Sequence, residues 1–243
     1  FNPAFPGLLG RDAGEIPAAD MQDFTDFILE VRLPPNPIRR LDNALTPAEA
    51  RGRNTYLNRP ATDGIASCNG CHTLDPARGF FGTNGTTTFE NEPQEMKVAH
   101  LRNAYQKVGM FGMPEVAFVN LPEPSTRHQG PQIRGFGFLH DGSIATVADF
   151  LRATVFFLSA RDEADLEEFV LAFDTTYAPI VGQQVTLTAD NPASAGPRVD
   201  LLQARATTPF ILVRQPGVRE CDLVARGVVA GEDRGYLFDP VSG

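Results

Sequence analysis

The sequence has no tryptophan, only three cysteines, and fewer cationic than anionic side chains. No apolar run approaches the roughly 18 residues that a transmembrane helix needs, so we predict no membrane span. Lysine and arginine number 21 against 30 aspartates and glutamates, which gives a formal charge of -9. Because such a surface repels a phosphate backbone, we expect no nucleic-acid partner.

A signal peptide is also missing from the start of the sequence. The segment that begins at Phe1 has neither a basic start nor an apolar stretch typical of such peptides. We therefore expect a mature or excised chain. Its last residues follow a strand-like run and a turn, which favours a longer multidomain parent protein or a complex.

The remaining sequence predicts three parts: an N-terminal extension over 1–43, a core domain over 44–177 and a small β-rich appendage over 178–243. Helices are expected where apolar residues recur at helical spacing. The expected helices cover 20–31, 45–57, 147–158 and 163–174. Thr46, Pro47 and Glu49 form the start signal of the second helix, as N-cap, N1 and N3. Short β-rich runs separated by Gly, Pro and Asp follow Ala178.

The most specific motif is Cys68-Asn69-Gly70-Cys71-His72, which fits the C-x-x-C-H pattern of covalent c-type haem attachment. Two thiols three residues apart on a helical turn each reach one vinyl group of the porphyrin, and the adjacent imidazole then lies beneath the iron. Gly70 allows the backbone to approach the ring closely. The motif predicts one haem c, joined to Cys68 and Cys71 and ligated by His72.

Two other uses of these cysteines fit less well. A structural zinc site needs four soft ligands, and only Cys221 remains to complete the set. A thioredoxin-like pair needs a preceding strand, which the residues before Cys68 do not supply. Cys221 itself is interpreted as a small buried residue, or alternatively as half of an intermolecular disulfide.

Further along the chain, Met96-Lys97-Val98-Ala99-His100-Leu101-Arg102-Asn103 and Leu139-His140-Asp141-Gly142-Ser143 accompany the attachment motif. Together these motifs resemble the C-terminal haem half of the bacterial di-haem cytochrome c peroxidase and MauG-like family, over about Leu45 to Phe173. In the peroxidases of that family, electrons enter at this half, whereas hydrogen peroxide reacts at the other haem. The resemblance therefore implies that this chain corresponds to the electron-entry half. It also makes Arg102 the best candidate for pairing with a haem propionate; a surface ion pair is the alternative.

This sequence departs from the family in three ways. One attachment motif supplies one haem, no tryptophan is present for an inter-haem path, and no methionine follows Met113. The sixth iron ligand is therefore sought in the insertion between the two motifs, where we expect Met110, or alternatively Met113. Both methionines could instead be ordinary core residues. Six aromatic residues are candidate walls of the haem crevice, although core packing explains them nearly as well: Phe80, Phe81, Tyr105, Phe111, Phe136 and Phe138.

These observations predict a mainly α fold, namely a class I cytochrome c-like helical haem domain with long loops, the N-terminal extension and the small C-terminal β unit. We expect single-electron transfer between redox partner proteins through a His/Met-ligated haem, because such an iron has no open site for peroxide or oxygen. The alternative is a peroxidase- or oxygenase-type enzyme with a labile sixth site and a second haem from elsewhere. Covalent haem attachment implies an exported chain, either periplasmic or extracellular.

Overall fold

The computed structural model of the chain describes residues 2–10, 14–87, 95–109, 135–212 and 215–240. The chain divides into two compact units, Phe1–Leu33 and Pro34–Gly243. Among the described residues, none of the helices combines the length and the apolar character that a bilayer crossing requires.

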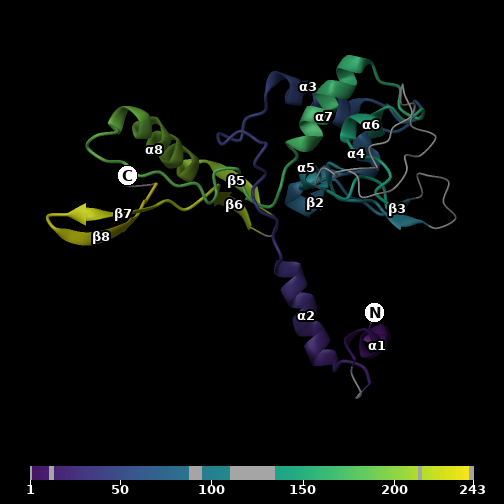
Figure 1. Cartoon of the computed structure of the whole chain (residues 1–243), viewed down its shortest axis with the longest axis horizontal. Coiled ribbons are helices and arrows are strands. Elements are labelled where there is room, and N and C mark those ends of the chain that lie inside the picture. Colours follow the sequence, from purple (N-terminus) through teal and green to yellow (C-terminus); the bar gives the residue numbers. More distant parts are fainter. Residues whose placement is uncertain (1, 11–13, 88–94, 110–134, 213–214, 241–243) are drawn as a thin grey trace. The chain divides into compact units, whose positions relative to one another are not determined.

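The described residues of the N-terminal unit form three helical elements, which Figure 1 shows in purple. They are η1 (Asn2–Ala4), α1 (Phe5–Leu9) and α2 (Ala18–Glu30). The side chain of Asn2 ties this unit together, because it donates to the carbonyl of Ile16 at 2.8 Å and accepts from its N–H at 2.9 Å. Helix α2 confirms the helix expected over 20–31, but none of its residues is buried.

Helices α3 (Pro47–Asn58) and α7 (Ala160–Leu171) form the centre of the second unit and pack directly against each other (Figure 1). Each begins with a capping box, in which an N-cap hydroxyl and an N3 carboxylate satisfy backbone N–H groups. Thr46 and Glu49 make this box in α3, as the sequence predicts, and Ser159 and Asp162 make it in α7. The two helices cross closely at Gly52, where an added Cβ would lie 2.0 Å from the carbonyl oxygen of Asp165.

Three buried aromatic rings pack against one another next to this crossing. Tyr56 lies 5.4 Å from Phe169 and 5.6 Å from Phe173, measured between ring centroids, and its ring meets both edge to face. All three side chains are fully shielded from solvent. This cluster forms the wall against which the Cys68–Cys71 turn packs, because Cys68 contacts the same hydrophobic core.

Helix α6 (Val147–Leu151) is shorter than the expected helix over 147–158. The residues after it leave the helix and bond to the loop that precedes Cys68. Asp63 donates its N–H to the carbonyl of Val155 at 2.8 Å, and Phe157 donates to that of Ala61 at 2.8 Å. The apolar stripe alone could not show these tertiary hydrogen bonds, which replace the helical ones.

The described strands form four two-stranded antiparallel sheets. The first two sheets lie in the segment after the cysteines, and the other two follow the C-terminal helix. In chain order the strands are β1 (Leu74–Asp75), β2 (Phe80–Phe81), β3 (Thr86–Thr87), β4 (Met96–Lys97), β5 (Pro209–Leu212), β6 (Gln215–Arg219), β7 (Val224–Val229) and β8 (Glu232–Leu237). The remaining elements are η2 (Pro76–Arg78), α4 (Cys68–Cys71), α5 (Ala104–Lys107) and α8 (Pro192–Thr207).

The expected mainly α, cytochrome c-like fold is wrong, since helices account for 38% and strands for 15% of the chain. Several strands are only two residues long, which is shorter than the runs that an alternating pattern can reveal. The expected C-terminal β unit also contains the 16-residue helix α8, and the β-rich run at 183–189 forms no strand. Leu202 and Ala206 of α8 are buried at helical spacing.

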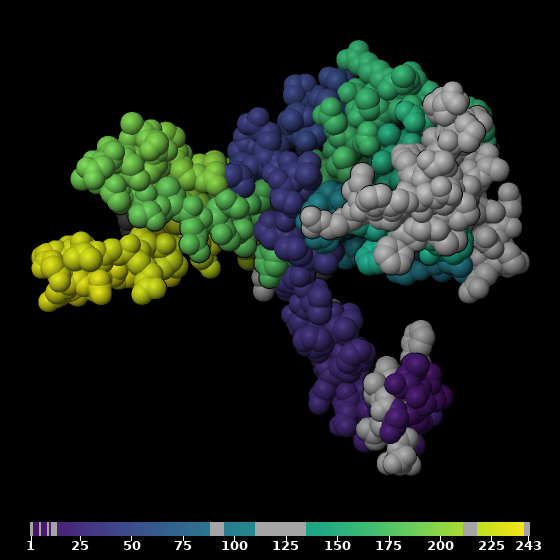
Figure 2. Space-filling model, in the orientation of Figure 1, coloured from purple at the N-terminus to yellow at the C-terminus, as the bar shows by residue number. Residues whose placement is uncertain are grey.

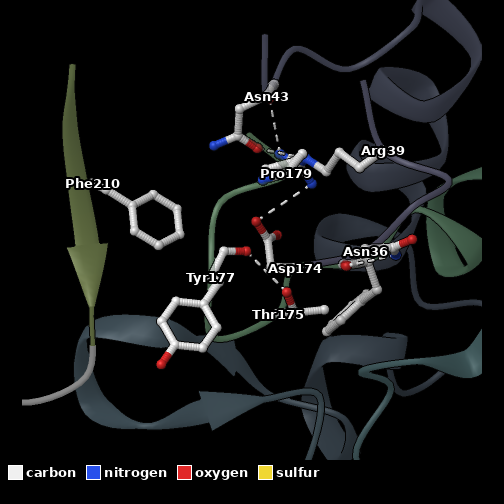
Figure 3. A pocket seen from close by; sticks show the side chains of 9 residues that line it. Asn36, Arg39, Asn43, Asp174, Thr175, Tyr177, Pro179 and Phe210 are labelled. Carbon is white, nitrogen blue, oxygen red and sulfur yellow. Dashed lines mark hydrogen bonds and ion pairs between the residues drawn. The ribbon is translucent and has the colours of Figure 1, made fainter. Parts of the chain in front are cut away.

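A polar network links the segment before α3 to the chain at the end of α7 (Figure 3). The side chain of Asn36 donates to the carbonyls of Leu171 and Phe173, and Arg39 pairs with Asp174 at 3.4 Å. The cavity between these residues holds about 10 Å³. Since one water molecule fills such a space, the cavity serves the packing of the unit and is no ligand site.

Candidate functional site

The Cys68–His72 motif forms a single helical turn, α4 (Cys68–Cys71), and His72 is its C-cap. The N–H of His72 donates to the carbonyl of Cys68 at 2.7 Å, and the N–H of Gly70 donates to that of Ser67 at 2.9 Å. The side chain of Asn69 closes the turn by accepting from the N–H of Leu74 at 2.9 Å. Both thiols of the motif are therefore carried by one short, internally bonded turn.

The two thiols differ in their surroundings. Cys68 is half-buried against the core, whereas Cys71 is exposed, and neither forms a disulfide. Burial raises the pKa of Cys68 to about 11. Cys68 is consequently a neutral thiol at pH 7, on the inner side of the turn.

The imidazole of His72 is held from one side by two backbone carbonyls. Its Nδ1 atom lies 3.1 Å from the oxygen of Gly82 and 3.0 Å from that of Ala99. Because both neighbours only accept hydrogen bonds, Nδ1 carries the proton and Nε2 keeps its lone pair. This tautomer is the one that a histidine needs in order to ligate a metal through Nε2.

Burial also acts on the charge of this histidine. Burial lowers the pKa of His72. The two carbonyl contacts raise it, but their effect is smaller. The neutral form is therefore favoured at pH 7. In addition, Tyr56 donates its hydroxyl to the carbonyl of His72. This contact fixes the backbone of the residue to the aromatic core.

The carbonyl of Gly82 reaches His72 because glycine occupies that position. The residue has φ +78°, and an added Cβ would lie 2.9 Å from Cγ of Leu101. Backbone bonds hold the loop there: Gly82 donates to Thr73 at 2.7 Å, and Leu101 donates to Phe81 at 3.1 Å. The segments around 82 and 99–101 thus form one support for the imidazole.

Arg102, a sequence-predicted site residue, lies next to this support. Its guanidinium carbon is 4.7 Å from the centroid of the Phe81 ring, and one of its nitrogens donates to the hydroxyl of Thr176 at 3.3 Å. Its Nε atom is buried and has no hydrogen-bond partner. Burial lowers the pKa of this guanidinium, and no carboxylate in the described part of the chain pairs with it.

Lys107 is a second half-buried cation near His72, and the motifs gave no sign of it. Burial lowers the pKa of its ammonium group, and its charge contributes to lowering the pKa of His72 and of His100. It forms no ion pair with any described carboxylate. Both cations lower the pKa of His100, whereas only Lys107 acts on that of His72. Two desolvated cations in one region suit a ligand with two carboxylates, as the haem propionates are.

The other predicted residues have different surroundings. The ring of Phe81 is 3% exposed and lies under Arg102, as described above, whereas the half-buried Phe80 lies 5.3 Å from the guanidinium of Arg78. Tyr105 is half-buried in α5. Three predicted residues lie outside the described residues, namely Met110, Phe111 and Met113.

The geometry of the site fits a covalently attached haem. Cys68 and Cys71 would hold the porphyrin, His72 would ligate the iron through Nε2, and Arg102 and Lys107 would face its carboxylates. In the described part of the chain, no three His, Cys, Asp or Glu side chains gather as a metal site would require. A haem needs no such group, because its porphyrin supplies four of the iron ligands.

Comparison with known proteins does not add to this assignment. No protein-family model, no curated protein and no solved structure matches the chain.

Proposed function

We propose that this chain is a c-type cytochrome domain that carries one haem, joined to Cys68 and Cys71 and ligated by His72, and that it transfers single electrons between redox proteins. The observation that supports the proposal best is the pair of carbonyl contacts to His72 Nδ1, at 3.0 and 3.1 Å. They fix the tautomer in which the lone pair of Nε2 is free to ligate iron. The C-x-x-C-H motif alone does not specify which tautomer His72 adopts.

The residues around the motif have separate parts in this function. The α4 turn presents both thiols, and the Gly82 and Ala99 carbonyls orient the imidazole and increase its basicity. Arg102 and Lys107 offset the negative charge of the cofactor in a region with little water. When bound, a haem supplies an iron that changes between ferric and ferrous states by one electron.

The proposal extends to the sixth ligand, the location and the relationships of the chain. We assign the sixth position to Met110, or alternatively Met113, which would raise the reduction potential and close the iron to peroxide. Because c-type attachment takes place outside the bacterial cytoplasm, the chain acts in the periplasm or outside the cell. The resemblance to the haem half of the di-haem peroxidase family that receives electrons is part of the same proposal.

Covalent attachment is tested by expressing the chain with a c-type maturation system, denaturing it and extracting it with acid acetone. The pigment should stay with the protein, and the mass should rise by one haem. Cys68→Ala and Cys71→Ala should each leave one thioether and shift the pyridine haemochrome band, whereas Cys221→Ala should leave the band unchanged. Pigment that leaves the unaltered protein entirely would end the proposal.

Electron transfer is tested separately, by optical redox titration of the holoprotein. One reversible one-electron step is expected, together with the weak long-wavelength band that marks ferric iron bound to methionine. Met110→Ala or Met113→Ala should remove that band, and the other substitution should not. Rapid turnover of peroxide by the reduced protein would favour the enzyme alternative instead.

A further inference from the structure

The C-terminal hairpin of strands β7 and β8 is exposed along its whole length, and Figure 2 shows it in yellow. Its register runs without a bulge through six residue pairs, from Val224 opposite Leu237 to Val229 opposite Glu232. The turn residues Ala230 and Gly231 both have positive φ, as a tight two-residue hairpin of type I′ requires. No third described strand joins this sheet, although an isolated hairpin is only marginally stable in water.

The register identifies the backbone groups that point away from the hairpin. Phe238 donates its N–H to the carbonyl of Leu223 at 2.9 Å, which marks that pair as a hydrogen-bonded one. Because such pairs alternate along an antiparallel ladder, the N–H and carbonyl groups of Val224, Arg226 and Val228 point outward from β7. These groups form a free edge that another strand can join.

The two edges of the hairpin differ in their protection against pairing. Natural edge strands avoid association through charges, prolines or bulges. Strand β8 begins with Glu232, Asp233 and Arg234, so half of its edge is charged. Strand β7 has one charge, Arg226, and no proline or bulge. Strand addition is therefore favoured at β7.

One face of the hairpin also carries exposed apolar side chains, beside the charged Arg226 and Asp233. Val224, Val228 and Leu237 share this face, and 62%, 68% and 70% of their surfaces are exposed. A sheet of three or more strands with a hydrophobic face gains stability that a single hairpin lacks. An occupant of the β7 edge would thus satisfy both the backbone groups and part of this surface.

Charge indicates which occupant fits. The chain carries -9 overall, so two copies repel each other across most of their surfaces. The hairpin is an exception, because Arg226 and Arg234 balance Glu232 and Asp233 within it. A basic partner protein would be attracted to the acidic surfaces, whereas a second copy meets least repulsion at the hairpin.

We propose that β7 pairs antiparallel with β7 of a second copy, which gives a four-stranded sheet in the order β8, β7, β7, β8. A two-fold axis at Gly227 places Arg226 opposite Val228 of the other copy, with both in hydrogen-bonded positions. An axis at Arg226 would instead place two guanidinium groups directly opposite each other, which is unfavourable. The charged β8 edges on the outside close the assembly at two copies.

The association is tested by sedimentation equilibrium of the full haem-loaded chain. A monomer–dimer equilibrium is expected. Val228→Pro removes one outward N–H per copy and should weaken dimerisation by about tenfold or more. Gly235→Pro is the matched control, because its outward N–H lies on β8, and it should leave the dimer intact. A chain that stays monomeric at high concentration, or equal effects of both prolines, would overturn the proposal.

The register is tested by cross-linking. In a Cys221→Ser background, Gly227→Cys should form an intermolecular disulfide on mild oxidation. Directly opposite residues in a non-hydrogen-bonded pair lie about 4.5 Å apart at Cα, which a disulfide spans. Gly235→Cys should not cross-link. A dimer in which Gly227→Cys fails to cross-link, or in which Gly235→Cys does so, would show a different interface and refute the β7 pairing.

Discussion

Helices α2 and α7 have similar patterns but very different surroundings. Both are amphipathic, with 13 and 12 residues, and both repeat apolar side chains at helical spacing. In α7, Leu166 and Phe169 are 1% and 0% exposed, whereas in α2 Phe24 and Phe27 are 49% and 65% exposed. An apolar stripe therefore specifies a helix but does not guarantee that the stripe is buried.

The difference depends on what each helix meets. Helix α7 crosses α3 at Gly52, where the missing side chain lets the two backbones approach, and the rings of Tyr56 and Phe173 continue the contact. Helix α2 belongs to the other unit of the chain, and none of its residues is buried. Burial is a property of two complementary surfaces, which one segment cannot specify alone.

The largest effect is expected for Gly52→Ala. Its Cβ would lie 2.0 Å from a backbone oxygen of α7, so the helices must separate and the aromatic cluster must open. We expect a loss of more than about 4 kcal/mol in the free energy of unfolding, measured by urea denaturation with circular dichroism.

Gly196→Ala in α8 is the control for this prediction, because nothing lies within 4 Å of its added Cβ. Alanine should there stabilise the helix by about 0.5–1 kcal/mol. If both substitutions changed stability equally, the α3–α7 crossing would not have the close contact described above.

A smaller loss is expected when the packing of α7 is reduced without a clash. Phe169→Ala removes a fully buried ring that contacts Tyr56 and Phe173, and it should cost about 3–4 kcal/mol. Phe169→Leu should recover much of this loss, because it refills most of the volume. Equal instability of the two variants in urea denaturation would argue against a packing effect.

The ion pair across the same crossing predicts a pH-dependent effect that is smaller again. Two hydrogen bonds of 2.6 Å from Arg51 lower the pKa of Asp165. The unfolded pKa is about 3.9, so the pair stabilises the folded state above that pH. This stabilisation is lost as the pH falls through the lower folded pKa.

Asp165→Asn should consequently be less stable than the unaltered chain at pH 7, and the difference should shrink in strongly acidic solution. Arg51→Met should show the same narrowing, because it removes the other partner of the pair. Urea denaturation at a series of pH values measures both variants. A difference that stays constant over the acidic range would contradict a contribution from the ionised carboxylate.

The smallest effect is expected for Phe27→Ala in α2. Since 65% of this side chain is exposed, stability should change by less than about 0.5 kcal/mol. A Phe→Ala substitution should therefore cost much less stability in α2 than at Phe169 in α7. A cost above about 2 kcal/mol in urea denaturation would mean that α2 buries this ring in solution, as α7 buries Phe169.

Local signals allowed accurate prediction of several elements. Thr46, Pro47 and Glu49 identified the start of α3, because a capping box involves only residues within one turn. Prediction failed where distant segments compete for the same backbone groups. The hydrogen bonds that Val155 and Phe157 make with the loop at 61–66 ended α6 early, and α8 was missed in a region interpreted as β-rich.

The candidate site divides in the same way. The spacing of Cys68, Cys71 and His72 is visible in the sequence, and so is the resemblance that pointed to Arg102. The carbonyls of Gly82 and Ala99 are not visible, because every residue has a carbonyl and only the folded chain directs two of them to one imidazole. Lys107 was missed because lysines are common and its burial depends on packing.

The sequence by itself determined the C-x-x-C-H spacing, the helix caps and the stretches able to form amphipathic helices, since these features depend on neighbours within a few residues. Only the tertiary structure decided which stripe is buried, which tautomer His72 adopts and which strand edge stays open. Those outcomes depend on contacts between segments far apart in the chain, as Gly52 with Asp165 and His72 with Ala99 show.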